Sequence, residues 1–317
     1  MVHSGARSIE AFTISFEDKL LDEGQAAVNT ASHLGVEHHT VRVRDRNLSD
    51  NFLHSIWHSE IPVINTHGTA KFILSRTASA HVKGVMTGEG ADELFAGYPY
   101  FAANGRAGRP SGMRLQFANW YQLFASRQFV LGLLPIPREK DINRLIDLFG
   151  CAPYLGQRAL FYARFIRAQL NRDFLRYFSP LGALQLRAGE LRPLKIRTMT
   201  PVNLDRFLAL TYDLPAYHLN FLADRQEMAH AIEGRVPFLD NNAVAFATTL
   251  RGEALLGEGA GKTLIRRAFA KRLPPETLGS RKKIFLSPPT AVDDILRSEW
   301  AYHLLSRDVT DAVGVFD

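Results

Sequence analysis

Residues 9–86 alternate between short strand-like segments and segments with helical spacing, and this alternation constrains the fold more than any other feature. Phe12, Ile14 and Phe16 recur at every second position, which is the period of a strand with one buried face. The segments that predict strands are 9–16, 38–43 and 82–86, and those that predict helices are 22–35, 48–60 and 68–80. Strands that alternate with helices predict an α/β fold, with a parallel sheet flanked by helices and ligands bound at the carboxyl ends of its strands.

The pattern changes near residue 105, where long segments rich in arginine and aromatic residues begin. Three of these segments predict helices: 114–129, 157–175 and 214–232. We therefore expect an α/β part over residues 1–104 and a mainly helical part over residues 105–317. Ser49 or Asp50 is placed to cap the helix 48–60, and Asp240 is placed to cap a helix that begins at Asn241.

Composition limits the classes of protein that remain. No apolar run approaches the ~20 residues of a membrane helix, and the first residues do not resemble a secretory signal. Cys151 is the only cysteine, so we expect no internal disulfide, and nothing argues for an oxidising compartment. We therefore expect a cytoplasmic chain, and the lack of a long apolar run argues against a membrane partner. The net charge of +6 is best explained by a solvated basic face, and the next explanation is binding of an anionic small molecule such as a nucleotide. Nucleic acid is the least favoured partner, since no basic run is interleaved with aromatic residues.

Residues 84–98, GVMTGEGADELFAGY, place Glu89, Asp92 and Glu93 on a glycine-rich loop after a short apolar segment. A dinucleotide-binding fingerprint is disfavoured, because Glu93 stands where the third glycine of that motif should be. The segment 257–263, GEGAGKT, is not a P-loop, because three residues rather than four separate its first glycine from the Gly-Lys pair.

Two interpretations of the carboxylates in this loop then remain open. Asp92 and Glu93 could simply complement the dipole of a following helix, although this leaves Glu89 unexplained. Alternatively, the loop binds a magnesium nucleotide, since backbone N–H groups at a helix start favour phosphate and Mg²⁺ takes carboxylate oxygens.

Three segments together resemble the asparagine synthetase (glutamine-hydrolysing) family. Residues 86–101, MTGEGADELFAGYPYF, are similar to its Ser-Gly-Glu-Gly-x-Asp-Glu-x-Phe-x-Gly-Tyr motif. Residues 224–240 are similar to its Asp-Arg-x-x-Met-Ala and Glu-x-Arg-Val-Pro-Phe-Leu-Asp pattern. Residues 261–285 are similar to its C-terminal Lys-x-x-Leu-Arg, Leu-Pro and Arg-x-Lys-x-x-Phe pattern. The segments follow the order found in the family's C-terminal synthetase domain.

The resemblance implies an α/β fold like that of adenine-nucleotide α-hydrolases and an ATP-dependent, amide-forming synthetase that uses Mg²⁺. A carboxylate substrate, aspartate or a related acid, would become an acyl-adenylate, which ammonia from a glutaminase domain or subunit attacks. Three positions match residues that contact the nucleotide: Ile14, Thr87 and Gly88. Glu89 matches the glutamate needed to form the adenylate, Asp92 the aspartate that holds Mg-pyrophosphate, and Lys262 the lysine that stabilises charge on the α-phosphate.

Some departures from the family pattern modify this expectation. The family opens this domain with a Ser-Gly-Gly-x-Asp-Ser loop that grips pyrophosphate, and neither this loop nor the glutaminase domain with its terminal cysteine is found in the sequence. The sequence as it stands is therefore expected to be N-terminally incomplete, to bind Mg-ATP weakly and to form no amide. Ser15 and Ala96 stand where the family usually has glycine. Residues 63–74 lack the arginine pattern of aspartate-specific enzymes, so the acceptor need not be aspartate.

Other functions and residues remain to be weighed. A catalytically inactive homologue that acts as a scaffold is the main alternative, and a protein that binds nucleic acid is a third. Two segments, 224–225 and 233–235, carry charges that we expect to form a buried ion-pair network: Asp224, Arg225, Glu233 and Arg235. The spacing of four histidines does not predict a metal site: His38, His39, His58 and His67.

Overall fold

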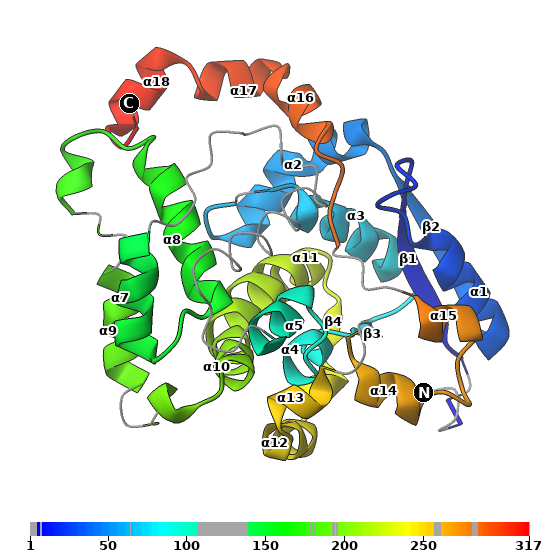
Figure 1. The fold of residues 1–317 in the computed structure, drawn as a ribbon. Helices are drawn as coiled ribbons and strands as arrows, with labels where there is room; N and C mark the ends of the chain where they lie inside the picture. Colours follow the sequence, from blue (N-terminus) through cyan, green and yellow to red (C-terminus); the bar gives the residue numbers. More distant parts are fainter. Residues whose placement is uncertain are drawn as a thin grey trace.

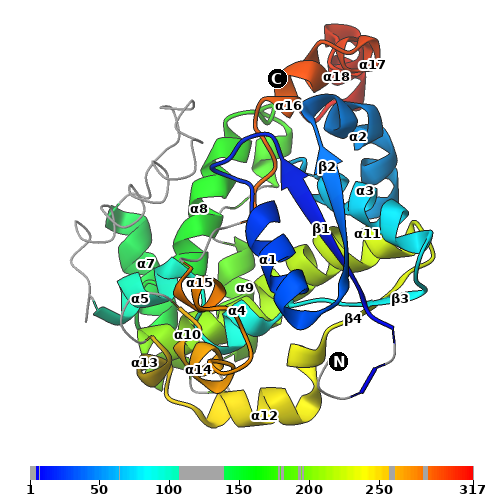
Figure 2. The same cartoon turned by 90° about the vertical axis from the view of Figure 1, so that its right-hand side faces the viewer.

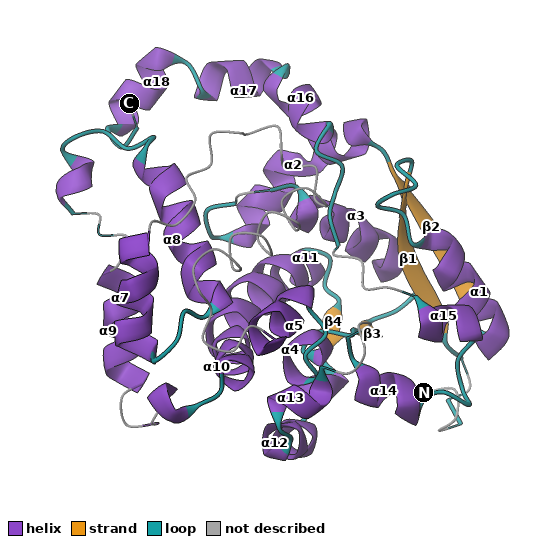
Figure 3. Cartoon of the chain, in the orientation of Figure 1, coloured by secondary structure: helices purple, strands orange, loops and turns teal. Residues whose placement is uncertain are grey.

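The computed structural model in Figure 1 describes residues 5–6, 8–63, 65–106, 139–177, 179, 182–191, 194, 196–256, 261–280 and 285–316. The helix predicted at 114–129 lies outside these residues, as does most of the segment GEGAGKT. Helices dominate the described part of the chain, and the strands are few and short (Figure 3). None of these helices is both long and apolar enough to cross a lipid bilayer.

The first sheet pairs β1 (Glu10–Phe16) with β2 (Glu37–Val43) in parallel, as the sequence predicts. Between them runs α1 (Gly24–Leu34), which ends at Gly35 in the left-handed conformation that favours glycine. One face of the pair packs on α3 (His67–Ser79) through a shared apolar cluster: Ile14, Phe16, Val41, Val43, Leu48, Ala70, Ile73 and Ala291. Gly24 of α1 lies against Ser15, on the opposite face (Figure 2). Helices therefore cover both faces of this pair.

The second sheet pairs β3 (Gly84–Met86) with β4 (Glu233–Arg235), again in parallel. The described residues thus form two strand pairs instead of one continuous sheet. The strand predicted at 82–86 is present as β3, but the burial that its apolar character suggests is wrong, because Gly84 and Met86 are exposed and Met86 retains 53% of its accessible surface. No described segment covers that surface, so β3 positions the loop that follows it without contributing to the core.

The other helices surround these pairs (Figures 1 and 2). In chain order they are α2 (Asp45–Ser59), α4 (Ala91–Leu94), α5 (Pro99–Arg106), α7 (Glu139–Phe149), α8 (Tyr154–Arg167), α9 (Gly182–Leu191), α10 (Pro201–Leu208), α11 (Arg225–Met228), α12 (Asn241–Thr249), α13 (Gly252–Leu255), α14 (Thr263–Ala268), α15 (Pro275–Gly279), α16 (Ala291–Leu296), α17 (Glu299–Leu304) and α18 (Arg307–Val313). Short 3₁₀ turns occur at η3 (Phe174–Arg176), η5 (Ile196–Thr198) and η7 (Pro237–Leu239). Among the described residues after 138, helices alternate with loops, and strand structure is limited to β4 and one isolated bridge.

Some predicted helix boundaries are wrong, because hydrogen bonds outside the helical pattern set where these helices begin and end. Helix α2 begins at Asp45 instead of near Ser49, because the Asn47 side chain accepts a hydrogen bond from the Arg44 N–H at 3.0 Å and closes the helix earlier. Helix α8 ends at Arg167, and the backbone beyond it pairs with the C-terminal segment through the Asn171 N–H and the Val315 carbonyl, 3.0 Å apart.

The segment predicted as a helix over 214–232 begins earlier and is wound differently. Residues Ala209–Asp224 form a π-helix, η6, which contains Pro215 and runs directly into α11. A π-helix uses i→i+5 hydrogen bonds, so residues four and five positions apart share a face. This spacing decides which side chains of η6 reach the cavity described below.

Arg206 of α10 ties three helices together from a buried position, since only 5% of its surface is exposed. Its guanidinium donates to the carbonyls of Leu94 at 2.7 Å, Ala247 at 2.9 Å and Leu250 at 3.3 Å, and to the Asn203 side chain at 3.1 Å. These acceptors lie at the ends of α4 and α12 and within α10 itself. Burial lowers the pKa of Arg206, yet the carbonyl cage gives its two terminal NH₂ groups partners that water would otherwise supply.

We expect Arg206→Met to lower the free energy of unfolding by about 2–4 kcal/mol, because the carbonyls of Leu94 and Ala247 would lose a buried donor. Equilibrium unfolding in urea measures the change. Arg46→Ala is the control, since Arg46 is 88% exposed in a surface ion pair and should shift stability by less than about 0.5 kcal/mol. Equal losses in the two variants would contradict this role of Arg206.

Candidate functional site

A cavity of about 500 Å³ lies between the N-terminal strands and the helical part, and residues from both line it. Five of the six site residues predicted from the sequence are among them: Ile14, Gly88, Glu89, Asp92 and Lys262. Thr87 is not, although it immediately precedes Gly88 and its N–H bonds the Arg235 carbonyl at 2.9 Å. Residues that are far apart in the sequence therefore meet around one cavity.

Close approaches at three glycines shape the loop that follows β3. Gly90 has φ +88°, and a Cβ there would lie 2.3 Å from a methyl group of Leu239. A Cβ on Gly97 would lie 1.9 Å from Asp92 Oδ1, and one on Gly261 would lie 2.6 Å from the Gly97 carbonyl oxygen. Only glycine fits these positions, so the loop folds tightly onto the chain that leads into α14.

This packing places opposite charges side by side at the cavity wall. Lys262 Nζ lies 3.0 Å from Asp92 Oδ1, and Lys71 Nζ of α3 lies 3.8 Å from Glu89 Oε1. The site thus presents two carboxylates and two ammonium groups. Lys71 was not predicted, because at the sequence level it is an ordinary polar residue of an amphipathic helix.

The third carboxylate of the loop, Glu93, has a different position. It is 2% exposed, does not line the cavity, and accepts a hydrogen bond from the Tyr98 hydroxyl at 3.0 Å. Burial raises the pKa of Glu93. Of the three acidic side chains in this loop, Glu89 and Asp92 face the cavity and Glu93 is part of the supporting core.

The wall of the cavity formed by the helical part carries residues that the sequence did not single out. Asp213, Tyr217 and His218 come from η6, where the i→i+5 spacing places them on one face. Arg158 of α8 forms an ion pair with Asp213, and His218 Nε2 lies 3.7 Å from the second oxygen of that carboxylate. Burial would raise the pKa of Asp213, but the hydrogen bond from His218 and the charge of Arg158 outweigh it and lower the pKa.

Aromatic rings continue this wall. Tyr100 stacks on Tyr154 with ring centroids 4.2 Å apart and on Tyr98 at 5.3 Å, and all three line the cavity. The Tyr100 hydroxyl is buried and has no hydrogen-bond partner among the described residues. The cavity therefore has a charged side, with Glu89, Asp92 and the two lysines, and an aromatic side.

The model of the asparagine synthase family matches residues 1–317 of this chain. The chain belongs to the asparagine synthase family. It is 24% identical over 313 residues to asparagine synthetase [glutamine-hydrolyzing] 1 of Bacillus subtilis, covering 96% of this chain and 46% of that protein. It is 28% identical over 301 residues to a putative asparagine synthetase of Mycobacterium tuberculosis, covering 92% and 43%.

A third relative has a different name. The chain is 23% identical over 300 residues to the amidase chry2 of Gibberella zeae, covering 89% of this chain and 44% of that protein. The chain thus spans less than half the length of each of these relatives. The matched region in the asparagine synthetases covers their synthetase domain.

Other residues predicted for this family member have mixed outcomes. Asp240 caps α12 as expected, accepting hydrogen bonds from the N–H groups of Asn242 at 2.9 Å and Ala243 at 3.4 Å. The prediction of a buried ion-pair network among Asp224, Arg225, Glu233 and Arg235 is wrong. Glu233 and Arg235 pair with each other in solvent, 66% exposed each, and Arg225 pairs with the exposed Glu60. The reason is that β4 lies at the surface, where these side chains need no buried partner.

Ala96 has φ +51°, in the left-handed region that favours glycine. This is a conformation that glycine, which the family usually carries there, adopts without steric cost. The loop geometry is therefore set by the contacts of Gly97 and Gly90, and not by local preference at position 96.

We expect Gly97→Ala to lower the free energy of unfolding by roughly 1–3 kcal/mol, because its methyl group would overlap the Asp92 carboxylate. Gly88→Ala is the matched control in the same loop. No atom lies within 4 Å of the Cβ position there, so stability should change by less than about 0.5 kcal/mol. Urea unfolding of both variants tests this, and a stable Gly97→Ala protein would show that the Asp92–Lys262 packing is not required.

His67 should make stability depend on pH. Burial, and secondarily the charge of His218, lower the pKa of His67 from 6.5 to about 4. The unfolded chain binds this proton more readily, so stability should fall as pH drops from about 6.5 to 4, by roughly 3 kcal/mol from this group. Urea unfolding across this range should show a shallower pH dependence in His67→Gln. The exposed control His33→Gln should keep the wild-type slope, and an unchanged slope in His67→Gln would contradict the assignment.

Proposed function

We propose that this chain is the synthetase part of an ATP-dependent, amide-forming ligase. It binds Mg-ATP in the cavity, activates a substrate carboxylate as an acyl-adenylate, and passes that intermediate to ammonia. Residues 1–104 form the nucleotide-binding part, on a fold related to the adenine-nucleotide α-hydrolases, and residues 105–317 complete the site. Ammonia comes from a glutaminase domain or subunit.

The observation that carries the proposal is the convergence of Glu89, Asp92 and Lys262 on one cavity beside Ile14 and Gly88. These residues come from β1, the loop after β3, α4 and the turn before α14. The family match extends over the whole chain, and ATP-dependent amide ligation is the general chemistry that the names of its asparagine synthetase relatives suggest.

The chemistry needs two group transfers. In the first, an oxygen of the substrate carboxylate attacks the α-phosphorus of ATP, the bond to the β-phosphate oxygen breaks, and pyrophosphate leaves. In the second, the ammonia nitrogen attacks the carbonyl carbon, AMP leaves with the bonding electron pair, and the nitrogen loses a proton. Negative charge grows on the α-phosphate oxygens in the first step, and a fixed cation there is worth roughly 3 kcal/mol. Lys262 supplies this charge, and Glu89 is required for adenylate formation.

The described residues fit a magnesium nucleotide. Glu89 and Asp92 offer the carboxylate oxygens that Mg²⁺ prefers, and Mg²⁺ would neutralise the departing pyrophosphate. The Thr87 hydroxyl is buried without a hydrogen-bond partner among the described residues, and the space around Gly88 is open. Asp92, which we assign to the metal, is held by Lys262 at 3.0 Å, so both residues are positioned before ligand binds.

The acceptor carboxylic acid lies against the aromatic side of the cavity. Tyr98, Tyr100 and Tyr154 form a stacked surface there, and the buried Tyr100 hydroxyl offers a hydrogen bond. Such a wall suits a planar or aromatic acid better than the short polar side chain of aspartate. A panel of aspartate and aromatic carboxylic acids in the exchange assay below identifies the acceptor class.

Substrate-dependent ATP–pyrophosphate exchange by the full-length protein tests the proposal. Glu89→Ala should abolish exchange, while Glu276→Ala, an exposed carboxylate on α15, should retain it. Lys262→Ala should slow exchange by about a hundredfold with a smaller change in Mg-ATP affinity, because its charge acts most in the transition state. Lys271→Ala is the exposed control.

Calorimetric titration with Mg-ATP, which measures the binding affinity, completes the test. Gly88→Ala should weaken binding about tenfold or more, because the added methyl group would occupy the space of the nucleotide while leaving the fold intact. Normal exchange in Glu89→Ala would remove the catalytic assignment. Loss of affinity at an unchanged rate in Lys262→Ala would limit that residue to binding. An inactive wild-type protein that binds no nucleotide would favour the scaffold alternative.

A further inference from the structure

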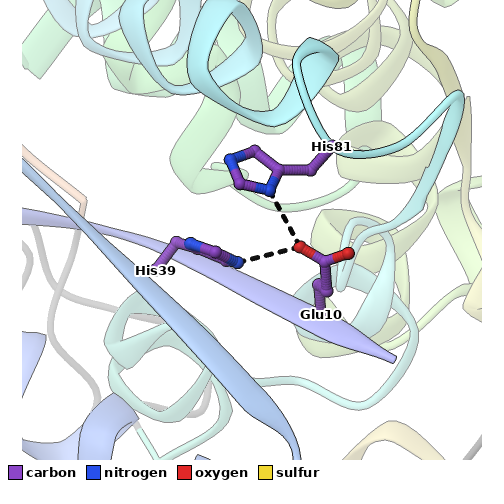
Figure 4. A group of neighbouring side chains, drawn as sticks. All are labelled: Glu10, His39 and His81. Atoms are coloured by element: carbon purple, nitrogen blue, oxygen red, sulfur yellow. Dashed lines mark hydrogen bonds and ion pairs between the residues drawn. The ribbon is translucent and has the colours of Figure 1, made fainter. Parts of the chain in front are cut away.

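Outside the cavity, three side chains with metal-binding atoms gather at the amino-terminal ends of the first strands. Glu10 is the first residue of β1, His39 belongs to β2, and His81 lies in the turn after α3. The three point toward one another (Figure 4). None of them lines the cavity proposed for the nucleotide.

The strand register brings the first two together. Phe12 lies opposite His39 in the β1–β2 pair, so Glu10, two residues before Phe12, projects from the same face. The turn after α3 then places His81 over this face. Spacing along the chain did not reveal the cluster, because its members belong to three different elements. Glu10 lies 29 residues before His39, and His81 lies 42 residues after it.

The geometry is close to that of a metal site. Both imidazoles approach one carboxylate oxygen, Glu10 Oε2, with His39 Nε2 at 2.8 Å and His81 Nδ1 at 3.1 Å. All three candidate ligand atoms lie within 4.8 Å of one another. Zinc bonds of about 2.0–2.2 Å in tetrahedral geometry place ligand atoms roughly 3.3 Å apart. A cation would therefore need only small side-chain shifts to take the place of the His39–Glu10 hydrogen bond and the His81–Glu10 ion pair.

The surroundings hold the rings in place and leave room for a further ligand. The His39 ring stacks on Phe12, with centroids 4.9 Å apart, and contacts the His81 ring at 4.2 Å. The side chains of Glu10 and His39 are 20% and 22% exposed, and that of His81 is 36% exposed, so a cation can enter from solvent. Glu37 Oε1 lies 3.5 Å from His39 Nε2 and can take the fourth position, as can water.

We propose that Glu10, His39 and His81 form a binding site for a divalent transition metal, occupied by Zn²⁺. Two imidazole nitrogens and one carboxylate oxygen suit zinc, whereas Mg²⁺ prefers an all-oxygen shell. The bound ion joins β1, β2 and the turn between α3 and β3. It thereby steadies the frame that carries Lys71 on α3 and the loop after β3.

Zinc titration of the chelator-treated protein, in competition with a chromophoric chelator, tests the proposal. We expect one Zn²⁺ per chain, with affinity reduced on the order of a hundredfold or more in His39→Ala and His81→Ala. His38→Ala is the matched control: His38 is the neighbour of His39 on β2 but points to the other face, where its Nε2 lies 3.1 Å from the Thr13 hydroxyl, so zinc affinity should not change. Millimolar Mg²⁺ should not displace the zinc.

Two further measurements keep the result independent of folding defects. Saturating Zn²⁺ should raise the unfolding temperature of the wild type and of His38→Ala by several degrees, but not that of His39→Ala. Glu10→Gln preserves the shape of the side chain and should also weaken zinc binding. Equal zinc affinity in the wild type, His39→Ala and His81→Ala would overturn the proposal, as would a wild-type protein that retains no zinc. The three side chains would then be a hydrogen-bonded cluster only.

Discussion

The buried guanidinium of Arg206 is the interaction on which the arrangement around the cavity depends. It joins the end of α4 to α12 and α10 through carbonyl acceptors, at 2.7 Å from Leu94 and 2.9 Å from Ala247. Helix α4 has only four residues and cannot hold its own position by internal hydrogen bonds. Its place is fixed by packing, by the Arg206 bonds and by the tight approach of Gly97 to Gly261. The position of Asp92 relative to Lys262 follows from these contacts.

The sequence predicted most of the N-terminal fold because its signals are local. Alternation of Phe12, Ile14 and Phe16 located β1, and Asp240 was recognised as a cap because its side chain bonds N–H groups two and three residues ahead. Met86 was placed wrongly because apolar character alone does not tell whether another element covers a strand. That information lies in the tertiary packing, and the exposed pair of Glu233 with Arg235 on β4 was misjudged for the same reason.

The candidate site was predicted in part, and the residues missed on η6 share one physical cause. Glu89, Asp92 and Lys262 stand in motifs that can be recognised in the sequence, whereas Asp213 and His218 belong to a π-helix. Residues five positions apart, such as Asp213 and His218, share a face of η6 but lie roughly 140° apart around an α-helix, so α-helical periodicity does not select them as a pair. Glu93, the third acidic residue of the loop, stands in a recognisable motif and yet does not line the cavity. Glu93 has the same local setting as Asp92, and only its burial at 2% exposure separates a supporting role from a place at the cavity.

The proposed metal cluster and the cavity are physically connected through one ring. Phe12 lines the cavity and also stacks on His39, with centroids 4.9 Å apart, and meets the edge of His81 at 5.5 Å. Ligands of parallel sheets bind at the carboxyl ends of the strands, and the cluster occupies the amino end of β1. Side chains two residues apart on a strand share a face, so Glu10, Phe12 and Ile14 form one continuous row from the cluster to the cavity. A cation that fixes Glu10 and His39 would therefore restrict Phe12, and through it the wall that Ile14 presents to the cavity.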